Sequence, residues 1–419
     1  MFLLGIAAAF VPAINNIYPL LAGGLVVCIL FDVLVLFWNP EIELRRFYPL
    51  KAALGVKTDL SLELINRGNR RLVVRFYEGM PNHCDYEGFP HVVSLGVAIK
   101  ERFSFPVTFN QRGETVISAG HIETASPIQL WWKRGKIGET HELKVYPNYQ
   151  PALQYGLFCL ADRVQQMGII KPRQKGQSKE FHQLRDYQEG DSLRSIDWKA
   201  TSKKQVLISR EYQEEKDQTL ILAIDTSSRS RAMDGDLPIL DHLLNAAIFI
   251  SYMALQQGDK VGIMSFGGAP RFLPPVKGKQ NLSHILNHVY NYEASDNFGD
   301  YHQWVEELHL KQKKRATVIL LTNLRAEDQF ESIPALQIVA KKHQLLVASM
   351  KEQSLVDLLK KPVEFEKDAT HYIGAKAYEQ DTDQVVQDFN NAKIRTFRDT
   401  AEKFPIMLAN HYLDMVAQR

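Results

Sequence analysis

Two nearly uncharged apolar runs open the chain. Residues 1–38 contain no Lys, Arg or Glu and a single Asp. The run Tyr18–Trp38 can cross about 30 Å of hydrocarbon as a helix, at ~1.5 Å per residue, and its aromatic ends suit the two interfaces. The run Phe2–Ile14 is shorter and contains Pro12, and the polar pair at 15–16 follows it as a turn. The pattern predicts a transmembrane hairpin over 1–40 with a shortened first helix.

A cleaved signal peptide is the alternative interpretation of these runs. It is disfavoured because a basic segment before the runs is missing and no small-x-small cleavage site follows them. Arg45, Arg46 and Lys51 come after the second run, while the turn between the runs is uncharged. The positive-inside rule then predicts an inner (cytoplasmic) membrane protein whose soluble domains face the cytoplasm.

Asp32 lies inside the second run, about two turns from its end. Carboxylates within a membrane are costly and often functional. The simpler interpretation is an acid that reaches the interface or bonds to the partner helix, and we favour it over a functional role.

Residues 44–147 alternate between apolar and polar positions over short runs. Asp59–Ile65 and Arg71–Tyr77 alternate around the turn residues 66–69, and further β-rich runs cover 100–109, 114–118 and 141–145. No long helical period interrupts them. Short strands with regular turns predict a small β-sandwich domain.

The pattern changes after residue 147. Residues 148–178 predict a connecting helix, from Tyr149 to Gly168, and a polar linker. Over 179–419, near-continuous apolar runs alternate with helical spacing. The expected buried strands are 219–224, 261–266, 317–321 and 345–349, and the clearest helix is Leu240–Gln256. This alternation predicts an α/β domain with a doubly wound parallel sheet, in which ligands bind at the carboxyl ends of the strands.

Composition and motifs narrow the functional classes. Fifty Lys and Arg against 48 Asp and Glu give a net charge of +2, so no basic face for nucleic acid is indicated. The three cysteines fall in no zinc-binding spacing. The sequence contains no GxSxG, HExxH, GxxxxGK[ST] or strand-following GxGxxG motif, so no residue is assigned a catalytic role.

Several segments resemble one bacterial family. The longest is EFHQLRDYQEGDSLRSIDWKATSKKQVLISREY at 180–212, and the others are AIDTS at 223–227, QQGDKVGIMSF at 256–266, RGETVISAGHIETASPIQLW at 112–131 and LANHYLDM at 408–415. Together they are similar to the domain-of-unknown-function-58 family over nearly the whole chain.

The resemblance implies a membrane hairpin, a small β domain and a von Willebrand factor A-like domain. It also implies association with a MoxR-type AAA ATPase. No catalytic activity is established for that family as a class, so the resemblance supplies none.

A von Willebrand factor A-like domain also implies Mg²⁺ as a candidate cofactor, held by a DxSxS motif, a Thr of a second loop and an Asp of a third. Asp225 and Ser227 match the first motif, but Arg229 stands at its last position, where Ser228 or Ser230 could substitute. Asp296 is the best oxygen ligand of the second loop. In the third loop an Asn, at position 323, replaces the Asp and weakens the attraction for a divalent cation. Capping of loop amides by the Asp and Ser is the alternative.

The charged block of 185–210 also allows two interpretations. Its charges alternate in sign, and Ile196 and Trp198 are expected to be buried anchors. The block is either an internal ion-pair network, which we favour slightly, or a docking surface for a partner.

Two functions remain open. The first is a membrane-anchored, non-enzymatic adaptor that presents a protein-binding surface to an AAA ATPase or its client. The second is a cell-envelope hydrolase with an unrecognised active site, which requires a deep pocket with converging polar groups.

Overall fold

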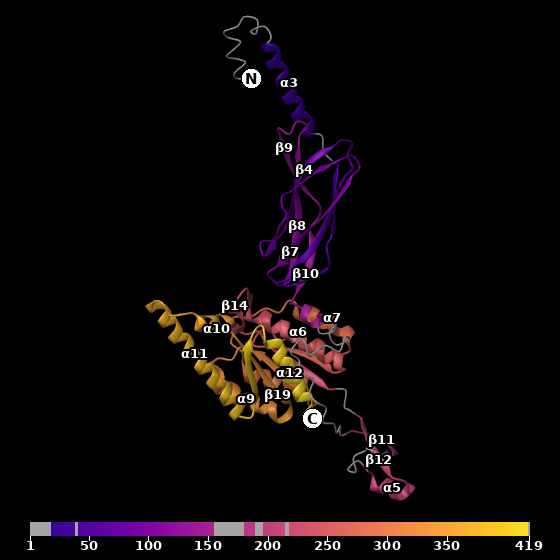
Figure 1. Ribbon diagram of the computed structural model, residues 1–419, viewed down its shortest axis with the longest axis vertical. Coiled ribbons are helices and arrows are strands. Elements are labelled where there is room, and N and C mark those ends of the chain that lie inside the picture. The colour runs from indigo at the N-terminus through magenta and orange to yellow at the C-terminus, as the bar shows by residue number, and fades with distance from the viewer. Residues whose placement is uncertain (1–17, 38–40, 155–179, 189–195, 214–217, 418–419) are drawn as a thin grey trace. The chain divides into compact units, whose positions relative to one another are not determined.

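The computed structural model describes residues 18–37, 41–154, 180–188, 196–213 and 218–417 (Figure 1). Contacts divide the chain into two compact units, Met1–Tyr146 and Pro147–Arg419. The predicted short first membrane helix and most of the predicted connecting helix fall outside the described residues.

Helix α3 (Tyr18–Phe37) begins the first unit. Its apolar side chains are exposed around its circumference; the exposed ones are Leu20, Leu21, Leu25, Val26, Val27, Leu30, Phe31 and Leu34. Among the described residues, one helix is long and apolar enough to cross a membrane, and that helix is α6 (Ile239–Gln257). The apolar part of α3, Leu20–Val35, is shorter. The candidate window of α6 is 78% buried, so α6 is a core helix of the second unit.

Two mainly antiparallel sheets form the rest of the first unit. One has the order β1-β3-β7-β5 and the other β2-β10-β8-β4-β6, with β9 pairing to β8. The strands are β1 (Ile42–Phe47), β2 (Lys51–Ala53), β3 (Thr58–Asn66), β4 (Leu72–Gly79), β5 (Cys84–Tyr86), β6 (His91–Leu95), β7 (Lys100–Phe109), β8 (Gly113–Ala125), β9 (Trp132–Ile137) and β10 (His141–Tyr146).

Alternation explains how these sheets pack. In β4 every second side chain is buried, as the sequence pattern predicts. Phe76 of β4 meets Phe103 of β7 across the sheets, with ring centroids 6.2 Å apart. The two apolar faces therefore share one core, in the manner of a sandwich.

A two-stranded hairpin with one short helix precedes the six-stranded sheet of the second unit in the sequence. It consists of β11 (Glu180–Asp186), α5 (Trp198–Lys204) and β12 (Ile208–Gln213), with β11 antiparallel to β12. Asp197 caps α5 by accepting from the backbone N–H groups of Lys199 and Ala200. Ile196 is buried as predicted, but Trp198 is 67% exposed, because α5 buries none of its residues. The prediction of a buried Trp198 is wrong.

The six-stranded sheet of the second unit has the order β17-β16-β13-β18-β19-β20. All neighbours are parallel except β17 and β16. The strands are β13 (Thr219–Asp225), β16 (Lys260–Phe266), β17 (Phe272–Lys277), β18 (Thr317–Thr322), β19 (Gln344–Lys351) and β20 (Arg395–Thr400). The predicted α/β class is confirmed, and so are the expected buried strands.

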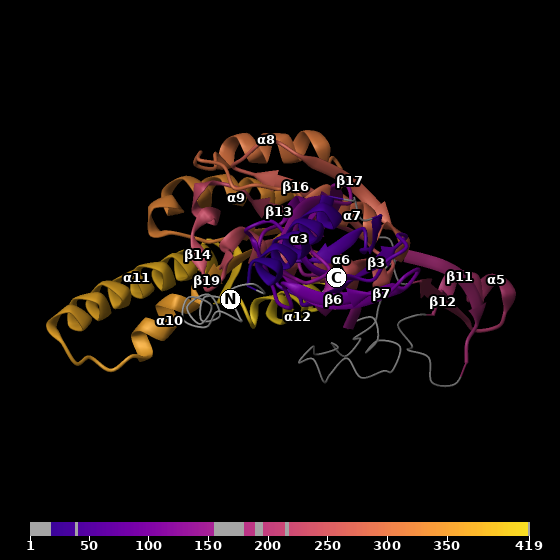
Figure 2. The ribbon, with the colours of Figure 1, turned by 90° about the horizontal axis from the view of Figure 1, so that it is seen from above.

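Helices cover both faces of this sheet (Figure 2). They are α6, α7 (Leu282–Val289), α8 (Tyr301–Lys311), α9 (Gln329–Lys342), α10 (Gln353–Lys360), α11 (Glu366–Asn391) and α12 (Phe404–Ala417). Helices on both faces explain why β13 and β18 are apolar without alternation.

Candidate functional site

The candidate site lies where β13, β16 and β18 end. These strands are parallel neighbours, so their carboxyl ends share one edge of the sheet, the edge at which doubly wound folds bind ligands. Asp225 is the last residue of β13, and Thr322 is the last of β18. The loops that follow the strands therefore converge here.

Asp225 is fully buried, and its carboxylate accepts hydrogen bonds from neighbouring polar groups. Its Oδ1 accepts from the backbone N–H of Ser227 at 2.9 Å and from the Ser227 hydroxyl at 2.5 Å. Its Oδ2 accepts from the hydroxyl of Thr322. Both carboxylate oxygens thus already have donors.

A guanidinium supplies the positive charge beside this carboxylate. Arg229 follows in the short 3₁₀ turn η3 (Ser228–Arg231), and its Nε lies 3.5 Å from Oδ2 of Asp225. The same Nε donates to the Ser227 hydroxyl at 3.2 Å, and Nη1 donates to the Tyr301 hydroxyl at 3.3 Å. The Arg229 side chain is 4% exposed, so the ion pair is closed to solvent.

Two further segments close over the β13 loop. Ser228 donates its backbone N–H to Asn297, and Ser295 donates to Thr226, at 2.9 and 2.8 Å. Gly267, at φ +80°, leaves no room for a side chain, because a Cβ would lie 2.6 Å from the Cβ of Ser227. This tight seam fixes the Asp225 loop in place.

The structure separates the predicted metal ligands. Asp225 and Ser227 lie together, whereas Asp296 pairs with Arg231 and its side chain is 86% exposed. Ser230 donates to the backbone carbonyl of Asp225 and not to its carboxylate.

These residues fit a divalent cation poorly. Mg²⁺ requires open oxygen ligands in near-octahedral geometry, whereas the oxygens of Asp225 already hold three donors and face Arg229. Within the described residues, no group of three or more His, Cys, Asp or Glu side chains could hold a metal. The Mg²⁺ site stays a prediction, and this arrangement disfavours it.

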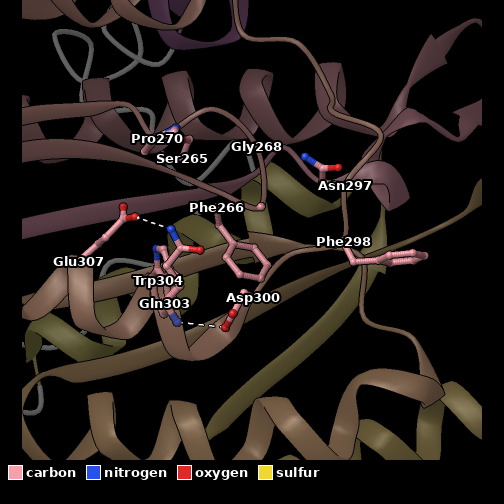
Figure 3. Close-up of a pocket in the computed structure, with 11 residues that line it drawn as sticks. Ser265, Phe266, Gly268, Pro270, Asn297, Phe298, Asp300, Gln303, Trp304 and Glu307 are labelled. Atoms are coloured by element: carbon pink, nitrogen blue, oxygen red, sulfur yellow. Dashed lines mark hydrogen bonds between the residues drawn. The ribbon is translucent and has the colours of Figure 1, made fainter.

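A cavity of about 150 Å³ opens beside this site, between the end of β16 and the start of α8 (Figure 3). Asp300 caps α8 by accepting from the backbone N–H groups of the next turn. Glu307 accepts from the Gln303 amide at 3.2 Å. Phe298 extends from the loop with 82% of its surface exposed, and Trp304 lines the cavity with a buried Nε1–H that has no acceptor.

A second polar cluster occupies the ends of β18, β19 and β20, and sequence reasoning missed it. Asn323 donates to Glu352 Oε1 at 2.6 Å, and Arg398 of β20 lies 3.7 Å from Glu352 Oε2. Burial, followed by the charge of Glu352, raises the pKa of the adjacent Tyr378. Asn323, which replaces the expected metal-binding Asp, therefore donates its hydrogen bond to a carboxylate of the protein itself.

The missed partners carried little sequence signal. An Arg four residues after a buried Asp, such as Arg229, is the only local hint of the internal ion pair. Glu352 and Arg398 are distant from Asn323 in sequence, and only the parallel order of the strands brings them together.

Residues 183–379 match the family model described as "Protein of unknown function DUF58". The resemblance to the domain-of-unknown-function-58 family is thus confirmed over that segment. The chain is also 24% identical over 221 residues to "Uncharacterized protein YeaD" of Bacillus subtilis (strain 168). The match covers 52% of each chain, so this chain spans about half the length of that relative.

Two solved structures each match about a quarter of this chain, with low TM-scores. A Salmonella alpha-2-macroglobulin reacted with methylamine matches 25% of this chain and 7% of its own, with 14% identity and a TM-score of 0.20. WR4, an MSP family member of C. elegans, matches 26% of this chain and 99% of its own, with 13% identity and a TM-score of 0.19. Neither informs the function of this chain.

Proposed function

We propose that the chain is a membrane-anchored, non-enzymatic adaptor. Its α/β domain is a von Willebrand factor A-like module that binds a protein partner at the carboxyl edge of the sheet, without a metal ion. The family match over 183–379 supports the assignment of the module.

The sheet supports the module type. With its strands numbered along the chain, its order is 3-2-1-4-5-6, a doubly wound arrangement, and its third strand, β17, is antiparallel. The Asp225 and Ser227 pair follows the first strand, at the position expected for the DxSxS motif.

The observation that carries the proposal is the Arg229–Asp225 ion pair. It places a positive charge of the chain itself beside the carboxylate that would otherwise bind a cation. A partner therefore meets a preformed, metal-free surface, and neither Asp225 nor Arg229 is open to it.

The charges around the cavity indicate the chemistry of that partner. Residues 293–307 contain five Asp and Glu and no Lys or Arg. Asp300, Glu307 and the largely exposed Phe298 line the same cavity. A Lys or Arg head group pairs with these carboxylates while its aliphatic stem packs on the ring. The resemblance names a MoxR-type AAA ATPase as the candidate partner.

Membrane anchorage is proposed through α3. Its apolar residues are exposed around the helix, so within the described residues no protein surface covers them. A helix of this composition is stable in lipid, where its backbone is satisfied internally. With Arg45 and Arg46 following it, the soluble domains face the cytoplasm.

The hydrolase alternative finds no specific support. The cavity of about 150 Å³ beside the candidate site, and a second of about 260 Å³ between α10 and α11, are both smaller than the roughly 300–1,000 Å³ typical of small-molecule sites.

The test uses the full-length chain in lipid nanodiscs and the purified MoxR-type ATPase of the same organism, with binding followed by interferometry. We expect binding to be unchanged by EDTA and weakened about tenfold or more by Asp300→Asn with Glu307→Gln, a loss of ~1.4 kcal/mol or more. Asn retains the helix cap and Gln retains the Gln303 bond, so the two changes remove charge alone. Glu306→Gln, exposed and outside the cavity, is the matched control. Loss of binding in EDTA, or equal weakening by Glu306→Gln, would contradict the proposal.

A further inference from the structure

The loop between β8 and β9 presents three large apolar side chains to the outside. Ile128 and Leu130 are each 55% exposed, and Trp131 is 48% exposed. Exposed apolar residues scattered singly need no explanation, but three within four positions at one loop tip mark an interaction surface.

Hydrogen bonds give this loop a fixed shape. The backbone N–H of Ser126 donates to the Trp131 carbonyl and that of Gln129 donates to the Ser126 carbonyl, both at 2.9 Å. The Ser126 hydroxyl accepts from the backbone N–H of Trp131 at 3.1 Å. The apolar side chains are therefore held outward by a closed turn.

Asp32 ties this loop to α3. Its side chain is fully buried, and its Oδ1 accepts from the backbone N–H of Ile128 at 2.9 Å. Asp32 stands five residues before the end of α3 at Phe37, which is about 7–8 Å along the helix axis. The loop thus reaches alongside the apolar helix rather than stopping at its end.

The end of α3 is fixed to the β domain by a second contact. Arg70 donates through Nη1 to the carbonyl of Val35 at 2.9 Å. At the start of β9, directly after the loop, the ring of Trp132 lies under the guanidinium of Arg75, which is 3.8 Å from the ring centroid. Guanidinium groups and tryptophan rings at the end of an apolar helix are typical of the level of lipid head groups.

We propose that the Ile128–Trp131 loop inserts into the lipid bilayer beside α3, with Asp32 as its tether. The inference rests on the proposed membrane anchorage of α3, because the loop reaches lipid only if the helix does. Its occupant is the interfacial region and upper acyl chains of the bilayer, continuous with the exposed apolar surface of α3. The tether also explains why an apolar helix contains a carboxylate. Inside the bilayer the backbone N–H of Ile128 has no water to bond to, and Oδ1 of Asp32 accepts its hydrogen bond instead.

The test measures the depth of single positions. The full-length chain, with its three cysteines replaced by serine, receives one cysteine labelled with the fluorophore NBD and is reconstituted into phosphatidylcholine–phosphatidylglycerol vesicles. Leu130→Cys is the test position and Val27→Cys, within α3, reports the anchor. Val116→Cys, 48% exposed on β8 and about 30 Å from the loop end of that strand, is the matched control.

Doxyl-labelled lipids should quench about half or more of the NBD emission at positions 27 and 130, and little at 116. Quenching at 27 without quenching at 130 would overturn the loop inference and leave the anchor standing. Quenching at neither position would overturn both. Quenching at all three would mean that the β domain lies on the membrane generally, and the specific inference would fall.

A second variant examines the tether. Asp32→Asn keeps an acceptor oxygen, whereas Asp32→Leu removes it and leaves the Ile128 amide without a partner. We expect quenching at position 130 to persist in Asp32→Asn and to fall about twofold or more in Asp32→Leu, while quenching at position 27 is unchanged in both. Equal quenching at 130 in both variants would contradict a tethering role for Asp32.

Discussion

An Arg–carboxylate pair in the β domain and another in the α/β domain are both almost closed to solvent, and the two pairs differ in geometry. In the β domain, Arg46 bonds to Glu78 through Nη2 and Nε, and the side chains are 7% and 0% exposed. In the α/β domain, Arg229 lies 3.5 Å from Asp225, and the side chains are 4% and 0% exposed. Burial alone does not separate the two pairs.

Their surroundings do separate them. Arg46 also donates to the Ser118 carbonyl, and Glu78 accepts from Tyr48, so three strands of the sandwich are joined. Arg229 instead joins Asp225 to the start of α8 through Tyr301, at the open edge of a parallel sheet. A bidentate pair in the middle of a domain is structural, whereas a looser pair at the carboxyl edge occupies the position of a ligand site.

The largest effect should come from breaking the bidentate pair. Arg46→Ala leaves Glu78 buried without its cation, which should lower the free energy of unfolding of the β domain by about 3–5 kcal/mol. Hydrogen exchange of β1 and β4 in the full-length chain measures this loss locally. Arg45→Ala, next in sequence but at an exposed pair with Glu43, should leave exchange nearly unchanged. Equal loss of stability in the two variants would contradict the expectation that the buried pair stabilises the domain more than the exposed pair does.

Removing the second arginine should cost less and should reveal its role. Arg229→Ser leaves Asp225 with the donors Ser227 and Thr322, so we expect a loss of about 2–3 kcal/mol in the stability of the α/β domain. The variant should also bind Mg²⁺ in calorimetry, with a regain of stability as Mg²⁺ rises. The control is Arg231→Ser, which removes an exposed arginine nearby. This variant should neither lose stability nor bind Mg²⁺.

Titration of Mg²⁺ into the unchanged chain tests whether the Asp225 site binds a metal ion while Arg229 is present. We expect no heat, because the guanidinium of Arg229 already faces the carboxylate. Binding by the unchanged chain that disappears in Asp225→Ala would show that the site holds a metal despite its arginine, and the metal-free interpretation would be wrong.

Unlike the two arginines, a buried histidine without a carboxylate partner should be neutral at pH 7. His343 is 2% exposed and accepts from the backbone N–H of Ala316 through Nδ1. Burial first, and then the charges of Lys342, His309 and Arg315, lower its pKa from 6.5 to about 4.

This shift sets the direction of the pH dependence. Between pH 6.5 and about 4 the unfolded chain binds the proton more readily than the folded one, so stability is full above pH 6.5 and falls as the pH drops. At pH 5 the contribution of His343 to the loss should be about 1–2 kcal/mol, and His343→Gln should remove that contribution. His302→Gln, at an exposed position, should retain it. Chemical unfolding at pH 7 and 5 measures the difference, and an unaltered pH dependence in His343→Gln would contradict the assignment.

The smallest expected effect concerns the hydroxyl beside the bidentate pair. Burial, together with Glu78, raises the pKa of Tyr48, so its hydroxyl stays protonated and donates to Glu78 at 2.8 Å. Tyr48→Phe should cost about 1 kcal/mol, because Arg46 still holds the carboxylate. Hydrogen exchange of β4 reports the change. A loss as large as that of Arg46→Ala would mean that the tyrosine, not the arginine, is the main partner.

Periodicity predicted several strands of each unit and the core helix α6. Alternation located strands such as β3 and β4, and continuous apolar runs located β13 and β18, because the period of burial is set by backbone geometry within one strand. Helix α6 was equally clear from its spacing and from the glycine that ends it, Gly258. Trp198 was misjudged, since its size suggested burial but α5 has no core beneath it.

The candidate site was predicted only in part. The sequence pointed to Asp225 and Ser227, because the motif that holds them is local. It placed Asp296 with them, but the structure turns that carboxylate to Arg231 and solvent. Orientation of a loop side chain depends on neighbours that local spacing does not reveal.

By itself, the sequence determined the classes of element, the apolar start, the α/β alternation and the acid at the end of β13, all of which follow from short-range periodicity and residue chemistry. Only the tertiary structure decided what surrounds that acid. The parallel order of the sheet brings Thr322 to Asp225 across 97 residues, and the turn after β13 folds Arg229 back onto it. Electrostatics in a buried site is set by the few groups within a few ångströms, and chain topology selects those groups.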